Sequence, residues 1–165
     1  MAAGKPNRGE AKPKDLSEKL IAENRKARYD YTIDDTIEVG VMLVGTEVKA
    51  LRDGRIDLKD AFAQIERSEL YLIGADIQVY SHGNVHNHLP KRRRKLLAHR
   101  KEIDKLEGRV KEKGYTLAAL KIYWKGGKAK ILLGLAKGKK QHDRRETIRE
   151  REDQRDLDRA KRRNR

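Results

Sequence analysis

The clearest pattern in the chain is an alternation of apolar and polar residues on both sides of Gly126-Gly127. Apolar side chains fall at every second position before the two glycines and again after them, which predicts two β-strands joined by a tight turn. Two adjacent glycines suit a type I′ turn, because both of its central residues need positive φ angles. Such a turn would pair Ile122 with Ile131 and Leu120 with Leu133. The apolar residues of the shared face are Leu120, Ile122, Trp124, Ala129, Ile131, Leu133 and Leu135.

An earlier hairpin is predicted from residues 61–65 and 70–77, which are rich in Ala, Leu and Ile. With Arg67-Ser68 as its turn, one face would hold two pairs, Ile65 with Leu70 and Ala63 with Leu72. Arg-Ser is a poor sequence for a primed turn, so the pattern leaves the register of this hairpin open.

The region before the first hairpin is predicted to hold two strands and a short helix. Tyr29, Tyr31 and Ile33 alternate with polar residues, and residues 36–44 are rich in Ile, Val, Met and Leu. The segment 45–52, GTEVKALR, has two apolar residues three positions apart and is followed by Asp and Gly. This pattern favours a short helix with a glycine stop.

A longer helix is predicted between the two hairpins. Leu96, Ile103 and Val110 recur every seven residues with Leu106 between them, which gives a narrow apolar stripe that would lie on the body. A proline precedes the stripe and Gly114 follows it, as start and stop signals do.

These elements together predict a mainly β fold, namely a small antiparallel OB-like β-barrel with about three peripheral helices and a disordered basic C-terminal tail. We expect a flexible arm over residues 1–20, an RNA-binding body over 21–137 and the tail over 138–165. Leu16, Leu20 and Ile21 could give the arm a short helical face.

Charge narrows the function. The chain has 41 Lys and Arg against 26 Asp and Glu, a formal net charge of +15. Such an excess indicates a polyanionic partner, bound with a strong dependence on salt. An acidic membrane surface is less favoured than nucleic acid because no apolar face lies opposite the basic runs. From Lys137 to the end, thirteen basic residues accompany seven acidic ones with almost no apolar side chains. We expect this segment to be unfolded alone and to become helical when phosphates neutralise it.

The composition also limits chemistry and location. The chain has no Cys, which excludes disulfides, thiolate ligands and a Cys nucleophile. No apolar run is long enough to span a membrane, and the first residues lack the apolar stretch of a signal peptide, so we expect a cytoplasmic protein. No nucleophile–base–acid set or glycine-rich phosphate loop is visible. The sequence therefore predicts a protein without a cofactor that is not an enzyme.

Three clusters could carry a function. His82, His86 and His88 have a spacing that can bind zinc, but no carboxylate lies between them, and a polar loop with imidazoles facing solvent or RNA is favoured. Five consecutive cations at 91–95 indicate phosphate positioning. On the outer face of the second hairpin, a basic and aromatic set could bind RNA, with Tyr123 stacked on a base, or could serve only to block association of the sheet edge. That set is Lys121, Tyr123, Lys125, Lys128 and Lys130.

Several segments resemble the SsrA-binding protein (SmpB) family of bacteria. The similarity runs in one order over residues 16 to 160 and is most specific in its last segment. The matching segments are Ala22–Tyr31 (AENRKARYDY), Gly45–Arg52 (GTEVKALR), Asn87–Pro90 (NHLP), Arg94–Leu97 (RKLL) and Ala136–Ile148 (AKGKKQHDRRETI). Arg67-Ser68 differs from the Asn-Gly expected at that turn.

The resemblance implies an oligonucleotide-binding-type barrel that binds the tRNA-like part of transfer-messenger RNA (tmRNA). It implies entry into stalled ribosomes with elongation factor Tu and alanyl-tmRNA, followed by tagging of the nascent chain in trans-translation. The family tail lies in the empty mRNA channel. The implied tmRNA contacts are Arg25, Lys26, Arg28, Glu47, Lys49, Asn87 and Arg94. The implied contacts of the tail with the decoding centre and mRNA channel are Lys137, Lys139, Lys140, His142, Arg144 and Arg145.

Two other functions remain open at this point. A ribosomal or other rRNA-binding protein would also be small, basic and tailed, but it would sediment stoichiometrically with all ribosomes. A metal-dependent nuclease using His82, His86 and His88 would cleave RNA in the presence of a divalent ion.

Overall fold

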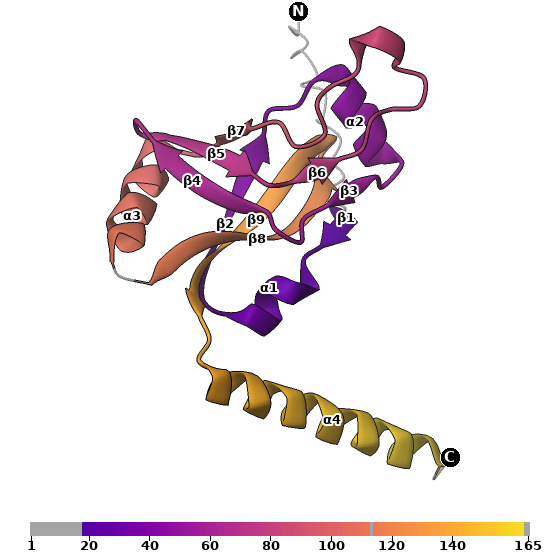
Figure 1. Cartoon of the computed structure of the whole chain (residues 1–165), viewed down its shortest axis with the longest axis vertical. Coiled ribbons are helices and arrows are strands. Elements are labelled where there is room, and N and C mark those ends of the chain that lie inside the picture. The colour runs from indigo at the N-terminus through magenta and orange to yellow at the C-terminus, as the bar shows by residue number, and fades with distance from the viewer. Residues whose placement is uncertain (1–17, 113, 164–165) are drawn as a thin grey trace, which may run out of the picture.

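The computed structural model describes residues 18–112 and 114–163 of the chain. These residues form a mainly antiparallel β-sheet with four α-helices and one short 3₁₀ helix (Figure 1). The helices are α1 (Arg25–Asp30), α2 (Gly45–Arg52), η1 (Asn84–His86), α3 (Arg100–Lys111) and α4 (Gln141–Arg163). The strands are β1 (Glu18–Glu23), β2 (Tyr31–Val41), β3 (Ile56–Asp57), β4 (Phe62–Glu66), β5 (Glu69–Ile73), β6 (Asp76–Ile77), β7 (Arg94–Leu97), β8 (Tyr115–Lys125) and β9 (Lys128–Gly138).

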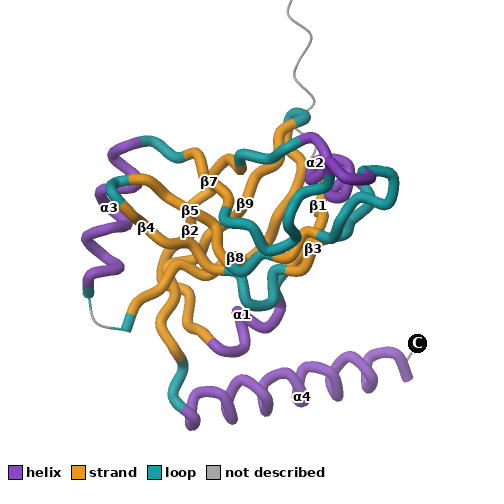
Figure 2. Tube along the Cα trace, turned by 45° about the horizontal axis from the view of Figure 1, so that its top comes forward, coloured by secondary structure: helices purple, strands orange, loops and turns teal. Residues whose placement is uncertain are grey.

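Seven strands pair in the order β1-β8-β4-β5-β7-β2-β9, and β8 also pairs with β9. That last pairing closes six of the strands into a ring, while β1 extends the sheet from β8 and β3 pairs separately with β6. Figure 2 shows α2 and the long loop after β6 at one end of the ring and α1 at another side. The main apolar core has contributions from most of the strands of the ring and from α2 and α3, with Leu70, Ile131 and Leu133 fully buried.

Both predicted hairpins are present, but the second strand of the first is shorter than the predicted 70–77, because β5 ends at Ile73 and β6 pairs with β3. In the first, Ile65 pairs with Leu70 and Ala63 with Leu72, as predicted for a turn at Arg67-Ser68. In the second, Gly126 and Gly127 adopt positive φ angles of 56° and 74°, and Ile122 pairs with Ile131. Alternation was therefore sufficient to locate the strands of both hairpins, and turn chemistry located only the turn of the second.

The predicted pairing of Leu120 with Leu133 is wrong. The register shifts between Ala119 and Lys121, and Ala119 pairs with Leu133 instead. This bulge turns the Leu120 side chain away from the main core and into a smaller apolar cluster with Ala27 and Ala118, beneath α1. Gly134 makes room for it, since a Cβ there would lie 2.9 Å from Leu120 Cδ1.

The two strands expected over 29–33 and 36–44 form a single strand, β2, and three boundaries also differ from the prediction. Leu20 and Ile21 lie in strand β1 rather than on a helical face, because they extend the sheet beside β8. Tyr29 belongs to α1, which begins where the Asn24 side chain accepts a hydrogen bond from the Ala27 backbone N–H at 3.0 Å. Leu96 lies in β7, so the predicted helix is shorter and starts at Arg100. The predicted arm falls almost wholly on residues 1–17, which lie outside the described ranges.

Helix α4 leaves the body after β9 and projects away from the ring (Figure 1). All described side chains between 145 and 161 are exposed. The Arg151 guanidinium lies 5.9 Å from the ring centre of Tyr29 in α1. The structure thus gives a helical backbone to the segment that we expected to be unfolded in the free protein. In the described parts of the chain, no helix combines the length and the apolar composition that a membrane crossing requires.

Candidate nucleic-acid interface

Helix α2 holds a buried carboxylate at its first turn. Glu47 is fully buried, and its Oε2 accepts a hydrogen bond from the Val44 backbone N–H at 2.9 Å. This bond satisfies a free amide at the helix start, and the negative charge suits the positive end of the helix dipole. The local sequence GTE therefore explains why the acid sits at this position.

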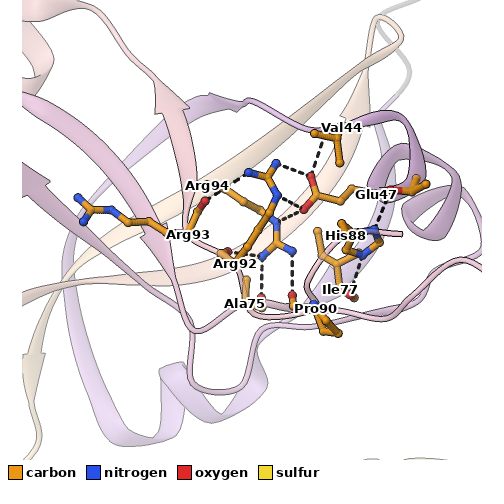
Figure 3. Close-up of polar contacts among 10 residues, drawn as sticks. Val44, Glu47, Ala75, Ile77, His88, Pro90, Arg92, Arg93 and Arg94 are labelled. Carbon is orange, nitrogen blue, oxygen red and sulfur yellow. Dashed lines mark hydrogen bonds and ion pairs between the residues drawn. The ribbon is translucent and has the colours of Figure 1, made fainter. Parts of the chain in front are cut away.

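Two arginines from one short segment converge on this carboxylate (Figure 3). Arg92 donates from Nε to Glu47 Oε1 and from Nη2 to Oε2, both at 2.7 Å. Arg94 donates from Nε to Glu47 Oε1 at 2.8 Å. The remaining nitrogens of Arg94 donate to backbone carbonyls of Ala75 and Pro90 at 2.8 Å and of Arg92 at 3.0 Å. The carboxylate and the buried guanidinium thus have close partners on all sides.

The cluster of Glu47, Arg92 and Arg94 joins three elements, namely α2, β7 and the loop before β7. Burial by itself raises the pKa of the Glu47 carboxyl, but the hydrogen bonds from Arg92 and from the Val44 amide, with the charges of both arginines, outweigh it and lower that pKa below its usual value. Burial lowers the pKa of Arg94 and Glu47 opposes that effect, whereas Glu47 raises the pKa of Arg92. All three groups are charged near neutral pH, and the cluster carries one excess positive charge.

The loop between β6 and β7 is held to α2 by further side chains. His88 is buried, with its Nε2 and the Ile77 carbonyl 2.9 Å apart and its Nδ1 2.9 Å from Thr46 Oγ1 at the start of α2. Asn87 closes the loop on itself, because its amide donates to the Tyr80 carbonyl at 2.7 Å and accepts from the Tyr80 N–H at 3.0 Å. The Lys49 ammonium lies 5.3 Å from the ring centre of Tyr80.

The loop environment changes how several candidate residues are interpreted. Glu47 and Arg94 have no exposed surface, so in this structure they present no atoms to a ligand. The Asn87 amide is already bonded to the Tyr80 backbone. Lys49 is exposed on the surface of α2, so its ammonium is accessible to a ligand. Both ring nitrogens of His88 have partners in the protein, so the interpretation of His82, His86 and His88 as a metal site is not supported.

The cations predicted in α1 lie on the surface. The side chains of Arg25, Lys26 and Arg28 are 91%, 51% and 58% exposed. Their ion pairs with Glu23 and Asp60 are long, between 3.9 and 4.0 Å, and leave the guanidinium and ammonium groups accessible. A polyanion could replace these weak partners at little cost.

The basic run 91–95 is more internal than predicted. Besides Arg92 and Arg94, Arg93 pairs with Glu66 at 2.5 Å and Lys95 pairs with Glu69. Only part of this run can therefore serve as a phosphate surface. Arg92 was recognised from sequence only as one of five cations, because its partner lies 45 positions earlier in the chain.

Tyr123 is not available for base stacking on the second hairpin. Its side chain is buried, and its hydroxyl donates to Glu38, which also pairs with Lys125 at 2.9 Å. Burial and the Glu38 carboxylate raise the pKa of Tyr123 well above its usual value, so the phenol stays neutral. Of the two alternatives left open for this face of the hairpin, the burial of Tyr123 argues against the one in which Tyr123 stacks on a base.

The predicted tail residues begin at the end of β9. The Lys137 ammonium lies 5.6 Å from the ring centre of Tyr115, and Lys139 donates from its backbone N–H to the Asp30 carbonyl at 2.9 Å. Arg145 is exposed in α4. The backbones of His142 and Arg144 lie in α4, and their side chains lie outside the described parts of the structure.

Known proteins are similar to this chain over most of its length. The family model described as SmpB protein matches residues 21–163. An SsrA-binding protein of Geobacillus thermodenitrificans is 54% identical over 142 residues, which are 86% of this chain and 92% of that protein. An SsrA-binding protein of Bacillus subtilis is 52% identical over 87% of this chain and 92% of its own length.

A solved structure gives the same result in three dimensions. A chain from the work described as "tmRNA-SmpB: a journey to the center of the bacterial ribosome" superposes with a TM-score of 0.63 and 48% identity, over 78% of this chain and 94% of that one. The region that the family model matches includes the buried cluster, the cations of α1 and helix α4. The chain therefore belongs to the SmpB family of SsrA-binding proteins.

Proposed function

We propose that this protein binds the tRNA-like part of tmRNA and brings it to stalled ribosomes in trans-translation. The observation that carries the proposal is the family match, which covers both the folded body and the basic helix α4. Relatives are named for binding SsrA RNA, and one solved relative is described with tmRNA and the ribosome. The net charge of +15 supports a partner with a phosphate backbone. The protein acts by binding and not by catalysis.

The body would hold tmRNA through its exposed cations. Arg25, Lys26 and Arg28 on α1 and Lys49 on α2 have accessible charges. Glu47, Asn87 and Arg94 would contribute indirectly by fixing α2 and the loop beside it. The closed ring of strands is consistent with an OB-like barrel as the scaffold.

The tail would act on the ribosome. Helix α4 has no buried apolar face in its described part, so packing against the body does little to stabilise it. We infer that it exchanges with unfolded forms in the free protein and becomes fully helical in the phosphate-lined mRNA channel, where message and tail compete for one space. The residues assigned to the decoding centre and channel are Lys137, Lys139, Lys140, His142, Arg144 and Arg145. Cytoplasmic location and delivery with elongation factor Tu and alanyl-tmRNA are part of the same proposal.

Truncation separates the two roles. Deleting residues 141–165 should leave affinity for tmRNA nearly intact and abolish tagging on ribosomes stalled at the end of a truncated message. Affinity is measured by filter binding and tagging by incorporation into a nascent chain, with the full chain as the control. A truncated protein that no longer binds tmRNA would contradict this division of labour. A protein present in equal numbers on all ribosomes would instead indicate a ribosomal protein.

A further inference from the structure

We propose that Arg92 is a positioning residue for the RNA-binding surface, acting as a removable link between α2 and the loop from Gln78 to Lys91. The part of the inference that is tested by RNA affinity rests on the proposed function. The part that is tested by amide hydrogen exchange in the free protein does not. The link consists of the two hydrogen bonds that Arg92 donates to the two carboxylate oxygens of Glu47.

Arg92 and Arg94 have different surroundings in the same cluster. The Arg94 side chain is fully buried and is bonded to three backbone carbonyls as well as to Glu47. The Arg92 side chain is 30% exposed, and besides Glu47 it donates to the Arg93 carbonyl over a long 3.4 Å. Arg94 with Glu47 makes a complete neutral pair in the core. Arg92 adds a second positive charge that the core does not need for neutrality.

The second charge has a geometric consequence. A bidentate Arg–carboxylate contact fixes the orientation of both partners more strictly than a single bond does. Glu47 belongs to α2, and Arg92 is the residue at which the loop returns to the body before β7. The contact therefore fixes the distance and angle between the loop end and the helix that carries Lys49.

The ends of the loop carry its backbone attachments to the body. Gln78 N–H donates to the Arg55 carbonyl at 3.1 Å, and just before the loop Ile77 N–H donates to the Pro90 carbonyl at 3.0 Å. Val85 and Leu89 in the loop are 91% and 76% exposed, so apolar packing does not hold these two side chains in place. The loop is held to α2 by the contact of His88 with Thr46. The end of the loop next to β7 is held to α2 by the contact of Arg92 with Glu47.

A structural readout tests the link in the free protein. Arg92→Met keeps an unbranched side chain, removes the guanidinium and leaves the Glu47–Arg94 pair balanced. We expect the urea midpoint to remain close to that of the parent, while amide hydrogen exchange between 78 and 91 becomes faster. Unchanged exchange would overturn the proposal, as would a large fall of the midpoint, because Arg92 would then be part of the core and not a separable link.

RNA binding tests the consequence. With a transcript of the tRNA-like part of tmRNA, Arg92→Met should lower the affinity about tenfold. The slope of log affinity against log salt should be unchanged, because no phosphate contact is removed. The affinity of Arg92→Lys should also be lower than that of the parent, because an ammonium restores the charge but cannot make the bidentate contact with Glu47. A slope reduced by about one together with rescue by Lys would overturn the proposal and make Arg92 a direct phosphate contact.

The matched control is Arg100→Met. Arg100 also pairs with an acid, Asp104 at 3.0 Å, but on the exposed face of α3 and within one helix. Its loss should change the affinity less than about twofold and leave the exchange of the loop unchanged. If the parent protein itself fails to bind the transcript, the proposed function fails, and the exchange experiment alone decides the role of Arg92.

Discussion

The basic run at 91–95 and helix α4 are both rich in cations but have opposite surroundings. In the run, each arginine meets an acid from a distant part of the chain, Glu47 or Glu66, and Lys95 meets Glu69. In the described part of α4, Arg159 pairs with Asp156 at 3.5 Å, a residue three positions away on the same helix. Acids that are distant in sequence fix the run in one geometry, whereas acids within the helix support α4 only locally.

On the proposed function, this difference would allow one basic segment to present a shaped surface and the other to adapt to the mRNA channel. A buried charge is tolerated only when it is paired, so the fully buried Glu47–Arg94 pair is held in one arrangement. Exposed pairs contribute little, so α4 can exchange them for phosphates without a large loss. Two cation-rich segments therefore differ in rigidity according to where their acidic partners lie.

The largest expected effect comes from removing the acid of the rigid region. Glu47→Gln leaves the buried Arg94 guanidinium without its counter-charge and should lower the free energy of unfolding by about 3–5 kcal/mol, the cost of breaking a buried pair. Urea unfolding followed by circular dichroism measures it. The matched change in the tail, Glu150→Gln, removes an exposed acid and should change the same free energy by less than about 0.5 kcal/mol. Equal effects of the two substitutions would refute the contrast between the regions.

The parent and Glu47→Gln should also differ in a defined way with pH. The folded-state pKa of Glu47 lies below the ordinary value of 4.5. Stability from the ionised carboxylate is therefore complete above that ordinary value and is lost as the pH falls through the folded-state pKa. The gap between the two proteins should hold from about pH 7 to 5 and narrow below about pH 4.5. Glu38 and Glu69 also have lowered pKa values, but they titrate in both proteins and cancel from the difference. A gap that widens in acid would exclude an ionised Glu47.

A smaller effect is expected at α1, a short helix with exposed cations that the body holds in place. The buried Asn24 amide donates to the Leu58 carbonyl at 2.7 Å and to the Ala119 carbonyl at 3.1 Å, while its oxygen caps α1. Asn24→Asp keeps the cap but places a carboxylate against the carbonyls, which should cost about 2 kcal/mol. Urea unfolding at neutral pH measures the cost, and a partial recovery at low pH, where the carboxyl can donate, distinguishes lost donors from lost packing. No change at neutral pH would show that α1 is held by other contacts.

The hairpins and α2 could be predicted from sequence because their signals are local. Alternation located the strands of both hairpins, and two glycines located the turn at 126–127. The bulge at Leu120 has no such signal, because it depends on the space left by Gly134 on the neighbouring strand. Leu96 has the right heptad spacing for the following helix by coincidence, and its pairing with Leu70 places it in a strand.

The candidate site could be predicted only in its residue types. The segments that carry Glu47, Arg92 and Arg94 were identified, but contact between residues 45 and 47 positions apart gives no periodic signal in a single sequence. Burial therefore changes the proposal for Glu47 and Arg94, from direct RNA contacts to indirect support of the surface. The exposed positions of the α1 cations do not depend on a distant partner. Their place on the surface agrees with the prediction from sequence.

The smallest expected effect concerns the turn of the first hairpin, where the residue types do not suit the backbone conformation. Arg67 and Ser68 both have positive φ angles, 47° and 62°, a region that residues with a Cβ adopt at a cost. The double substitution Arg67→Asn with Ser68→Gly supplies the residues that such a turn favours. It should raise the free energy of unfolding by about 0.5–1 kcal/mol, measured by urea unfolding.

The matched contrast in the tail is Asp156→Gly in α4. This substitution should lower the helix content but leave the unfolding midpoint of the body unchanged, because the described side chains around it are exposed. A body destabilised by the turn substitutions would mean that Arg67 or Ser68 makes a contact that outweighs the backbone strain. A midpoint shifted by Asp156→Gly would mean that α4 and the ring unfold together as one rigid unit, and the tail would then lack the independence that allows it to adapt to a channel.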